Sequence, residues 1–197
     1  MAALVYKVCA ADETIPEYIC DPCGEGEMGR VRGAAFVDKS LLPELIKTNI
    51  ENITWWEQQV NAGLINVIPS IRGTYDGGAP NTVTGFGDSK EKTTSKTHTV
   101  VFNDQNHKEN QLFYQFLENN YKRYILAFRT GSELRVATNN LSSFVAADNV
   151  EDDIDSNVLW NCTTTWQQKA PNTLIPIFDL VDDVKDLFSN CLETTTV

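Results

Sequence analysis

The chain has 197 residues, of which 42% are hydrophobic and 22% are charged, a composition typical of a folded globular protein with its own core. Its 27 acidic residues outnumber 16 basic ones, giving a formal net charge of −11. Proteins that bind nucleic acid neutralise phosphates with Lys and Arg, so this charge argues against a DNA- or RNA-binding module. No apolar run approaches the roughly 20 residues of a membrane span, and we expect no membrane partner.

Residues 1–30 are predicted to form an irregular N-terminal arm, in which residues 4–8 are compatible with a short strand. The chain begins without the basic flank and long apolar stretch of a signal peptide, which predicts synthesis in the cytosol. Cys20 and Cys23 have the spacing of a metal knuckle. A structural zinc site needs four ligands, and no second pair follows. The spacing therefore favours a tight turn with free thiols over a metal site or a disulfide.

Residues 31–38 have the composition of a strand, and Pro43 is well placed in the first turn of a short helix. A second short helix is predicted over residues 54–62, ending at Gly63. It contains Trp55 and Trp56. Adjacent side chains point to different sides, so one tryptophan is expected to meet another element or another chain. The alternative is that both belong to the core.

Residues 64–73 alternate in the manner of a strand, with an irregularity at Pro69. Residues 74–94 form the longest polar segment and cannot bury enough apolar area to be stable alone. A segment of this length in a compact domain is usually functional or disordered. It is also compatible with a long polar hairpin that has residues 82–84 on one arm.

Residues 95–130 predict a strand, a helix and a second strand, and the rest of the fold is expected to be organised around this unit. The first strand is β-branched and aromatic over residues 97–102. Asn106 and Glu109 have the spacing of a capping box that opens the helix. The predicted apolar stripe of this helix consists of Leu112, Phe113, Phe116, Leu117 and Tyr121. Residues 124–128 then form the second strand.

Residues 133–138 and 141–147 are predicted as two strands joined by a hairpin turn at Asn139 and Asn140. The acidic run at residues 151–155 is interpreted as a solvated turn rather than a calcium site. Residues 157–167 give the clearest strand, with one mainly apolar and one mainly polar face. The apolar face consists of Val158, Trp160, Cys162, Thr164 and Trp166.

Residues 177–188 predict an amphipathic helix of about three turns, because their apolar residues recur at helical spacing opposite a row of Asp and Lys. Leu180, Val184 and Phe188 belong to its apolar stripe. This stripe either folds back on the sheet of its own subunit or docks on a neighbouring subunit. The residues beyond 192 are expected to form a mobile tail.

The sequence lacks the common catalytic motifs. It has no nucleophile elbow, no phosphate-binding loop, no complete dinucleotide fingerprint and no paired metal-binding histidines on a helix. His98 and His107 have no nucleophile and carboxylate nearby in the pattern of a catalytic triad. We therefore expect no enzymatic activity, no cofactor and no metal.

The order of features between residues 64 and 171 resembles that of bacteriophage tail-tube-like virion proteins, including ring proteins of the neck and tail. The resemblance rests on residues 72–78 (RGTYDGG), 84–88 (TGFGD), 96–102 (KTHTVVF), 110–116 (NQLFYQF), 124–129 (YILAFR), 157–160 (NVLW), 164–166 (TTW) and Pro171. Each motif is short, and the N-terminal Cys-bearing stretch and the C-terminal helix lie outside the family pattern. These additions suit an adaptor or joining ring as well as a repeating tube subunit.

The resemblance implies an α+β fold, a mostly antiparallel β-sandwich or open β-barrel with one flanking helix, to which the sequence pattern adds a C-terminal amphipathic helix. We therefore expect an arm at residues 1–30, a β-rich tail-tube-like core domain at 31–171, and a helix and tail at 172–197. Such subunits pair through strand edges into rings or tubes in the virion tail or neck, through which DNA passes without specific binding. The partners would be identical subunits and other tail or neck proteins, after synthesis in the host cytoplasm. The candidate interface residues are Trp55, Trp56, Tyr75, Phe86, Lys90, Lys92, Leu180, Val184 and Phe188.

A second interpretation of a different class is a small, non-catalytic ligand- or carbohydrate-binding module. In it, Trp55, Trp56 and the segment 74–94 would line the ligand site. A third, more remote one is an enzyme that uses Cys20 or Cys23.

Overall fold

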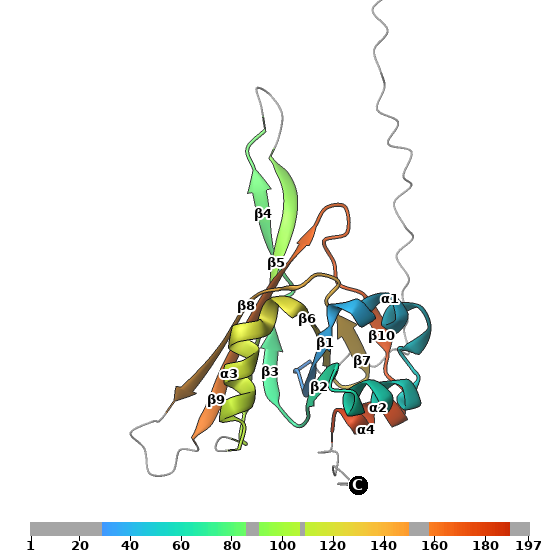
Figure 1. Ribbon diagram of the computed structural model, residues 1–197. Helices are drawn as coiled ribbons and strands as arrows, with labels where there is room; N and C mark the ends of the chain where they lie inside the picture. The colour runs from blue at the N-terminus through green and yellow to red at the C-terminus, as the bar shows by residue number, and fades with distance from the viewer. Residues whose placement is uncertain (1–28, 86–90, 107–108, 150–157, 190–197) are drawn as a thin grey trace, which may run out of the picture.

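The computed structural model describes residues 29–85, 91–106, 109–149 and 158–189. It confirms the predicted α+β class: the described strands form two antiparallel sheets that do not close into a barrel (Figure 1). Sheet A contains β3 (Arg72–Tyr75), β4 (Ala79–Val83), β5 (Lys92–Asp104), β8 (Leu141–Asn149) and β9 (Leu159–Lys169). Sheet B contains β1 (Gly33–Asp38), β2 (Ile65–Ile68), β6 (Tyr124–Arg129), β7 (Glu133–Val136) and β10 (Ile177–Asp179).

Sheet A has the order β3-β5-β9-β8, and β4 pairs with the same margin of β5 as β3, nearer the start of that strand. Sheet B has the order β10-β7-β6-β1-β2. The helical segments are η1 (Lys39–Leu41), α1 (Leu42–Glu44), η2 (Leu45–Asn49), α2 (Ile53–Asn61), α3 (Gln111–Asn120), η3 (Tyr121–Arg123) and α4 (Asp182–Leu187).

The protein is built in three layers, because sheet B is covered on both faces. One face of sheet B packs on sheet A and α3 through a cluster that includes Phe36, Phe102, Tyr114 and Trp166. The other face packs on α2 and α4 through a second cluster that includes Trp56. Every residue of β1 and β6 is buried. The continuous apolar run at residues 124–128 is therefore a strand covered from both sides.

The predicted strand–helix–strand unit is present as β5, α3 and β6, but the start of the helix differs from the expectation. The capping box is wrong, because α3 begins after Asn110 and that residue makes no side-chain cap. The buried Asp104 carboxylate organises the turn instead: Oδ1 accepts from the Asn106 backbone N–H at 2.9 Å, and Oδ2 accepts from Asn110 Nδ2 at 3.2 Å.

The helix α3 is also rotated from the predicted stripe. Tyr114 and Leu117 are buried, whereas Leu112 is 79% exposed and Phe116 47% exposed. Tyr114 is turned inward because its hydroxyl donates to Asp104 Oδ2 at 2.7 Å and its ring packs on Trp160. The core therefore receives Tyr114, whose hydroxyl has a buried acceptor, and leaves the purely apolar Leu112 and Phe116 exposed.

The C-terminal helix is much shorter than predicted. Residues 177–179 form β10, which pairs with β7 and completes one margin of sheet B, and only residues 182–187 form α4. Val184, Leu187 and Phe188 are buried in the cluster beneath α2. Of the two alternatives for the apolar stripe, folding back on its own subunit is the one observed for these residues.

The predicted hairpin at Asn139 and Asn140 is wrong, because β7 and β8 belong to different sheets. The connection crosses from sheet B to sheet A, and Ala137 N–H donates to Leu126 C=O at 2.8 Å on the way. Side chains hold the crossing in place: Thr138 Oγ1 and Asn139 Nδ2 both donate to Gln168 Oε1. A second link between the sheets is the bridge between Val31 and Gly73.

Candidate assembly surfaces

The margins of the two sheets differ in how well their backbone groups are satisfied. Strand edges are templates for pairing with another chain. In sheet A, Val31 covers β3 through two hydrogen bonds with Gly73, and Glu118 Oε1 accepts from Ala146 N–H at 2.8 Å on β8. Pro80 removes one donor from β4. Sheet A is therefore partly protected at both margins.

The β4–β5 hairpin projects from the body of the molecule (Figure 1). All five residues of β4 are exposed, and β4 pairs only with β5 among the described strands. The hairpin extends past the end of β9, whose last residue, Lys169, pairs with Ser95. Over its described part, the segment 74–94 therefore follows the hairpin alternative, with residues 79–83 as one arm and the start of β5 as the other. A two-stranded ribbon with no covering layer is marginally stable alone, so the hairpin is a surface suited to contact with a partner.

The central part of the solvent face of sheet A carries no charged side chain; Arg72 on β3 and Lys169 at the end of β9 are exposed at its margins. The register aligns rows of hydroxyl, amide and small apolar residues across β3, β5, β9 and β8. The residues of this central part are Thr74, Thr97, Thr99, Val101, Asn103, Ser143, Val145, Ala147, Asn161, Thr163, Thr165 and Gln167. In a chain of net charge −11, a broad uncharged face would neither attract nor strongly repel a polyanion.

The outer edge of β2 lies open in sheet B. Asp38 N–H donates to Leu64 C=O at 2.9 Å. Because facing residues of an antiparallel ladder alternate, this pairing turns the backbone N–H and C=O groups of Ile65 and Val67 away from β1. Among the residues that the structure describes, none bonds these outward groups.

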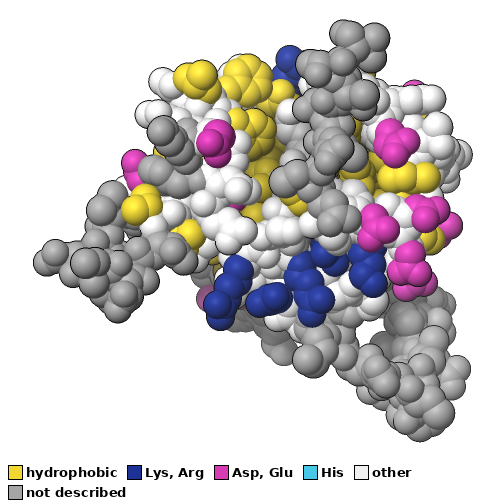
Figure 2. All heavy atoms as spheres, turned by 90° about the horizontal axis from the view of Figure 1, so that it is seen from below, with side chains coloured by type: hydrophobic (Ala, Val, Ile, Leu, Met, Phe, Trp, Pro, Cys, Tyr) yellow, Lys and Arg dark blue, Asp and Glu magenta, His cyan; other side chains and the backbone are white. Residues whose placement is uncertain are grey.

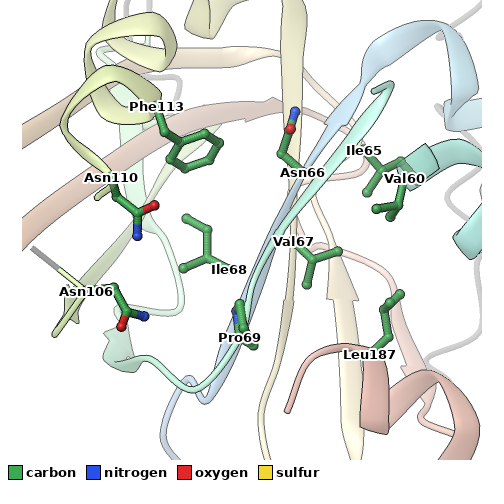
Figure 3. Close-up of a pocket in the computed structure, with 10 residues that line it drawn as sticks. All are labelled: Val60, Ile65, Asn66, Val67, Ile68, Pro69, Asn106, Asn110, Phe113 and Leu187. Carbon is green, nitrogen blue, oxygen red and sulfur yellow. The ribbon is translucent and has the colours of Figure 1, made fainter. Parts of the chain in front are cut away.

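A groove of about 330 Å³ runs along this open edge. Figure 3 shows Asn106, Asn110 and Phe113 on one side of β2, and Val60 and Leu187 on the other. The groove thus straddles the edge strand, with one wall from the start of α3 and the other from α2 and α4. It has no charged side chain among its described lining residues.

Basic side chains gather at the end of the molecule where β1 and β3 begin. Figure 2 views the protein from this end and shows a row of Lys and Arg side chains beside a group of acidic ones. Arg32 C=O accepts from Ile71 N–H, and Val31 pairs with Gly73, so the segments that carry Arg30, Arg32 and Arg72 lie side by side. The net negative charge is therefore not spread evenly over the surface.

Four of the predicted interface residues lie in the core of their own subunit. Trp56, Val184 and Phe188 have no exposed surface, and Trp55 is 8% exposed. Trp56 packs edge-on against Phe188 at 5.6 Å and donates from Nε1 to Ile50 C=O at 3.2 Å. Of the two alternatives for Trp55 and Trp56, the one that places both side chains in the core is observed. Because they are covered by their own chain, they offer no surface to a second subunit.

The other candidates are dispersed. Tyr75 is half-buried and faces inward, and Leu180 is partly buried against the cluster under α2. Lys92 is exposed at the start of β5, opposite Val83. Phe86 and Lys90 lie outside the described residues, as do Cys20, Cys23 and residues 151–155. Lys92 is thus the one candidate among the described residues that lies on the projecting hairpin with its side chain exposed.

His98 has partners that the sequence did not indicate. It is fully buried, and its ring lies roughly parallel to those of Tyr75 and Trp166, with centroids 5.9 and 5.4 Å away. Its Nε2 lies 2.9 Å from Thr173 C=O. A carbonyl only accepts, so Nε2 carries the proton and Nδ1 accepts from Tyr75 Oη at 2.7 Å. Burial lowers the pKa of His98 and raises the pKa of Tyr75 to about 12. His98 and Tyr75 are therefore both uncharged, and the hydrogen bond between them supports the structure at the base of the hairpin.

Cys162 is likewise structural. Burial raises the pKa of its thiol to about 12, and the nearby Asp104 and Glu118 carboxylates act in the same direction. A thiol held protonated in the core is a poor nucleophile. Within the described ranges, no group of three or more His, Cys, Asp or Glu side chains has the arrangement of a metal site.

No helix in the described part of the chain is long and apolar enough to cross a membrane. Comparisons with protein-family models, curated proteins and solved structures found no match for this chain.

One feature of β2 was present in the sequence. Residues 64–68 place apolar side chains on both faces of a predicted strand, Ile65 and Val67 on one and Leu64 and Ile68 on the other. A strand with two apolar faces is normally central in a sheet. In β2 the pattern reflects the two covering layers, because Ile65 and Val67 pack on the cluster under α2 and α4 and Ile68 packs on the cluster between the sheets.

Proposed function

We propose that this protein is a non-catalytic structural subunit that assembles with identical copies into a closed ring or tube of a bacteriophage tail or neck, through which DNA passes. The projecting β4–β5 hairpin carries the proposal. Its first strand is exposed along its whole length, and such a ribbon gains stability when a second subunit covers it. Contacts of this kind between different surfaces of identical subunits close into rings.

The uncharged solvent face of sheet A supports the same function and suggests the lining of the channel. Gripping DNA relies on Lys and Arg that contact phosphates. Hydroxyl and amide side chains over β5 and β9 supply none of these charges. We infer that this face is turned to the DNA, and that other virion proteins contact the ends of the ring.

The binding-module interpretation loses its main residues in this structure. Trp55 and Trp56 would have provided the aromatic platform, but both lie beneath sheet B and pack on each other edge-to-face. The groove beside β2 follows a sheet edge, and its polar side chains are three asparagines with no charged group among the described lining residues. We therefore favour assembly.

The test is the oligomeric state of the full chain, measured by native mass spectrometry and by negative-stain electron microscopy over a range of concentrations. We expect closed rings or short tubes. The variant Val83→Asp places a charge on the exposed strand β4, where Val83 is 50% exposed. It should keep the unfolding midpoint of the subunit and lose the rings. The matched control Leu174→Asp changes another exposed apolar side chain, 69% exposed, and should assemble normally. A monomer at every concentration would refute the proposal.

A further inference from the structure

We propose that the groove beside β2 binds residues 4–8 of a neighbouring copy of this chain, which adds a sixth strand to sheet B. This inference rests on the proposed assembly of identical subunits and names one contact that would hold them together. It assigns a docking function to an edge that the rest of the fold leaves open.

The first step is that the outer edge of β2 has backbone groups without a partner among the described residues. The outward N–H and C=O groups of Ile65 and Val67 form a ladder position that no described residue fills. Peptides commonly bind by adding a strand to such an edge, where the backbone supplies hydrogen bonds and pockets receive alternate side chains. Sheet A, by contrast, has Val31 and Glu118 bonded at its margins.

The second step is the shape of the groove. An added strand sends its side chains alternately to the two faces of the sheet. Here both faces have a wall: Phe113 with Asn110 on one side, and Val60 with Leu187 on the other (Figure 3). Leu187 is 4% exposed, so the wall from α4 is fixed by the core. A groove with only one wall would accept a surface loop, whereas this one accepts an extended segment.

The third step is the identity of the segment. Residues 4–8 read Leu-Val-Tyr-Lys-Val, all but one of them β-branched, aromatic or aliphatic. Leu4, Tyr6 and Val8 would face one wall, and Val5 and Lys7 the other. The segment has about the length of β2 and carries a single charge, which Lys7 can extend to solvent from the rim.

The fourth step is reach. The described chain starts at Gly29, and three residues later Arg32 C=O accepts from the Ile71 N–H, two residues beyond the groove residue Pro69. A connection within one domain usually takes about 2–6 residues, yet 20 residues, 9–28, separate the segment from Gly29. Fully extended, they span roughly 66–72 Å. This length exceeds the need within one subunit and suits the groove of the next copy.

The first experiment mixes two chains that each carry one introduced cysteine besides the fully buried Cys162. In a background with Cys9, Cys20, Cys23 and Cys191 changed to Ser, one chain carries Tyr6→Cys and the other Val67→Cys. After mild oxidation, a disulfide between the two chains can form only between copies. We expect its yield to exceed, by about tenfold or more, that of Tyr6→Cys mixed with Val145→Cys, because docking raises the local concentration of the thiols. Val145 is 54% exposed and lies on sheet A, away from the groove.

The second experiment compares Val67→Pro with Val67→Thr in the full chain. Proline removes the outward N–H of residue 67 without touching the β1–β2 ladder, and threonine keeps that donor at similar volume. We expect Val67→Pro to raise the dissociation constant of the assembly by about tenfold or more relative to Val67→Thr, with similar unfolding midpoints of the dilute subunit.

The outcomes separate the two proposals. Rings without the disulfide, or rings that are insensitive to Val67→Pro, overturn the strand inference and leave the ring proposal standing. A disulfide that forms only within a single chain carrying both Tyr6→Cys and Val67→Cys also overturns it, because the segment then fills its own groove. A chain that is monomeric throughout and forms no disulfide overturns both.

Discussion

At the scale of single residues, buried polar side chains fix the geometry beneath the exposed surfaces. His98 joins the base of the hairpin to the loop that carries Thr173. Gly78 lies so close to the imidazole that an added Cβ would approach it to 2.5 Å, and its φ of +91° also favours glycine. The hairpin is therefore anchored by a ring that the sequence presents only as an isolated histidine on a strand.

His98 predicts a loss of stability in mild acid. The folded protein holds the ring neutral with a lowered pKa, whereas the unfolded chain takes up a proton below the ordinary pKa of 6.5. The free energy of unfolding should thus be constant above that value and fall as the pH drops below it. Urea unfolding of the wild type and His98→Gln at about pH 7.5 and 5.5 measures this difference. The variant should be less stable at the higher pH but lose less on acidification; equal losses would contradict the assignment.

The hydrogen bond from Tyr114 to Asp104 predicts that removing the Tyr114 hydroxyl lowers the free energy of unfolding. Tyr114→Phe removes the donor at 2.7 Å from Asp104 Oδ2 and leaves the ring in place. We expect a loss of about 1.5–3 kcal/mol in the free energy of unfolding, typical of a buried hydrogen bond to a carboxylate. Urea denaturation measures it. The control Tyr121→Phe, on a half-buried ring whose hydroxyl makes no hydrogen bond among the described residues, should change stability by less than about 0.5 kcal/mol.

The sequence pattern predicted some of these buried residues and missed the contacts of others. The alternation of residues 157–167 correctly placed Trp160, Cys162, Thr164 and Trp166 on the buried face. The capping box failed because Asp104, a strand residue outside the motif, competes for the same backbone groups. Such a partner is brought near by the turn itself and is not apparent from spacing along a helix.

At the scale of elements, α3 shows why an apolar stripe does not fix the orientation of a helix. Leu112 and Phe116 have the stronger apolar character, yet the sheet receives Tyr114 and Leu117. The sequence shows several possible stripes on this helix, and the contact with Asp104 selects one of them.

This orientation predicts unequal effects of substitutions on one helix. Leu117→Ala should cost about 2–5 kcal/mol, because it opens a cavity beneath sheet A. Leu112→Ala should change the free energy of unfolding by less than about 0.5 kcal/mol, since its side chain is in solvent. Urea titrations of both variants give the comparison. Similar losses in the two would show that α3 packs through the stripe predicted from sequence.

The C-terminal segment shows a different limit of pattern analysis. The helical spacing of residues 177–188 is real, but Pro176 and the open margin of β7 favour a strand for the first three residues. Whether such a segment forms a helix or a strand depends on whether a neighbouring strand is available to pair with it. That information comes from tertiary structure, as it does for the crossing at Asn139 that separates β7 from β8.

At the scale of the whole molecule, sheet B is the shared middle layer, so the two clusters on its faces should unfold together. Trp160 and Trp166 report on the cluster between the sheets, and Trp55 and Trp56 on the cluster beneath α2 and α4. Two variants, each keeping one tryptophan pair with the other changed to Phe, should each show a fluorescence midpoint in urea equal to its circular dichroism midpoint. Separate midpoints would mean that the helical layer detaches before the sandwich opens.

The central strand–helix–strand unit followed from the spacing of apolar residues, because that spacing is local, whereas the class of fold was expected from the family resemblance. The division of strands between two sheets, the groove at β2 and the uncharged face of sheet A did not follow. They depend on which strands become neighbours. The ring and channel functions remain predictions that these surfaces motivate.

The length of β5 has a mechanical consequence. Ten registered residue pairs join it to β9, while its other margin holds β4 near one end and β3 near the other. A pull on the hairpin would load the β5–β9 hydrogen bonds lengthwise and simultaneously, in shear, instead of peeling them one after another. A tube pulled through this hairpin would therefore place its load on the β5–β9 pairing, the longest among the described strands.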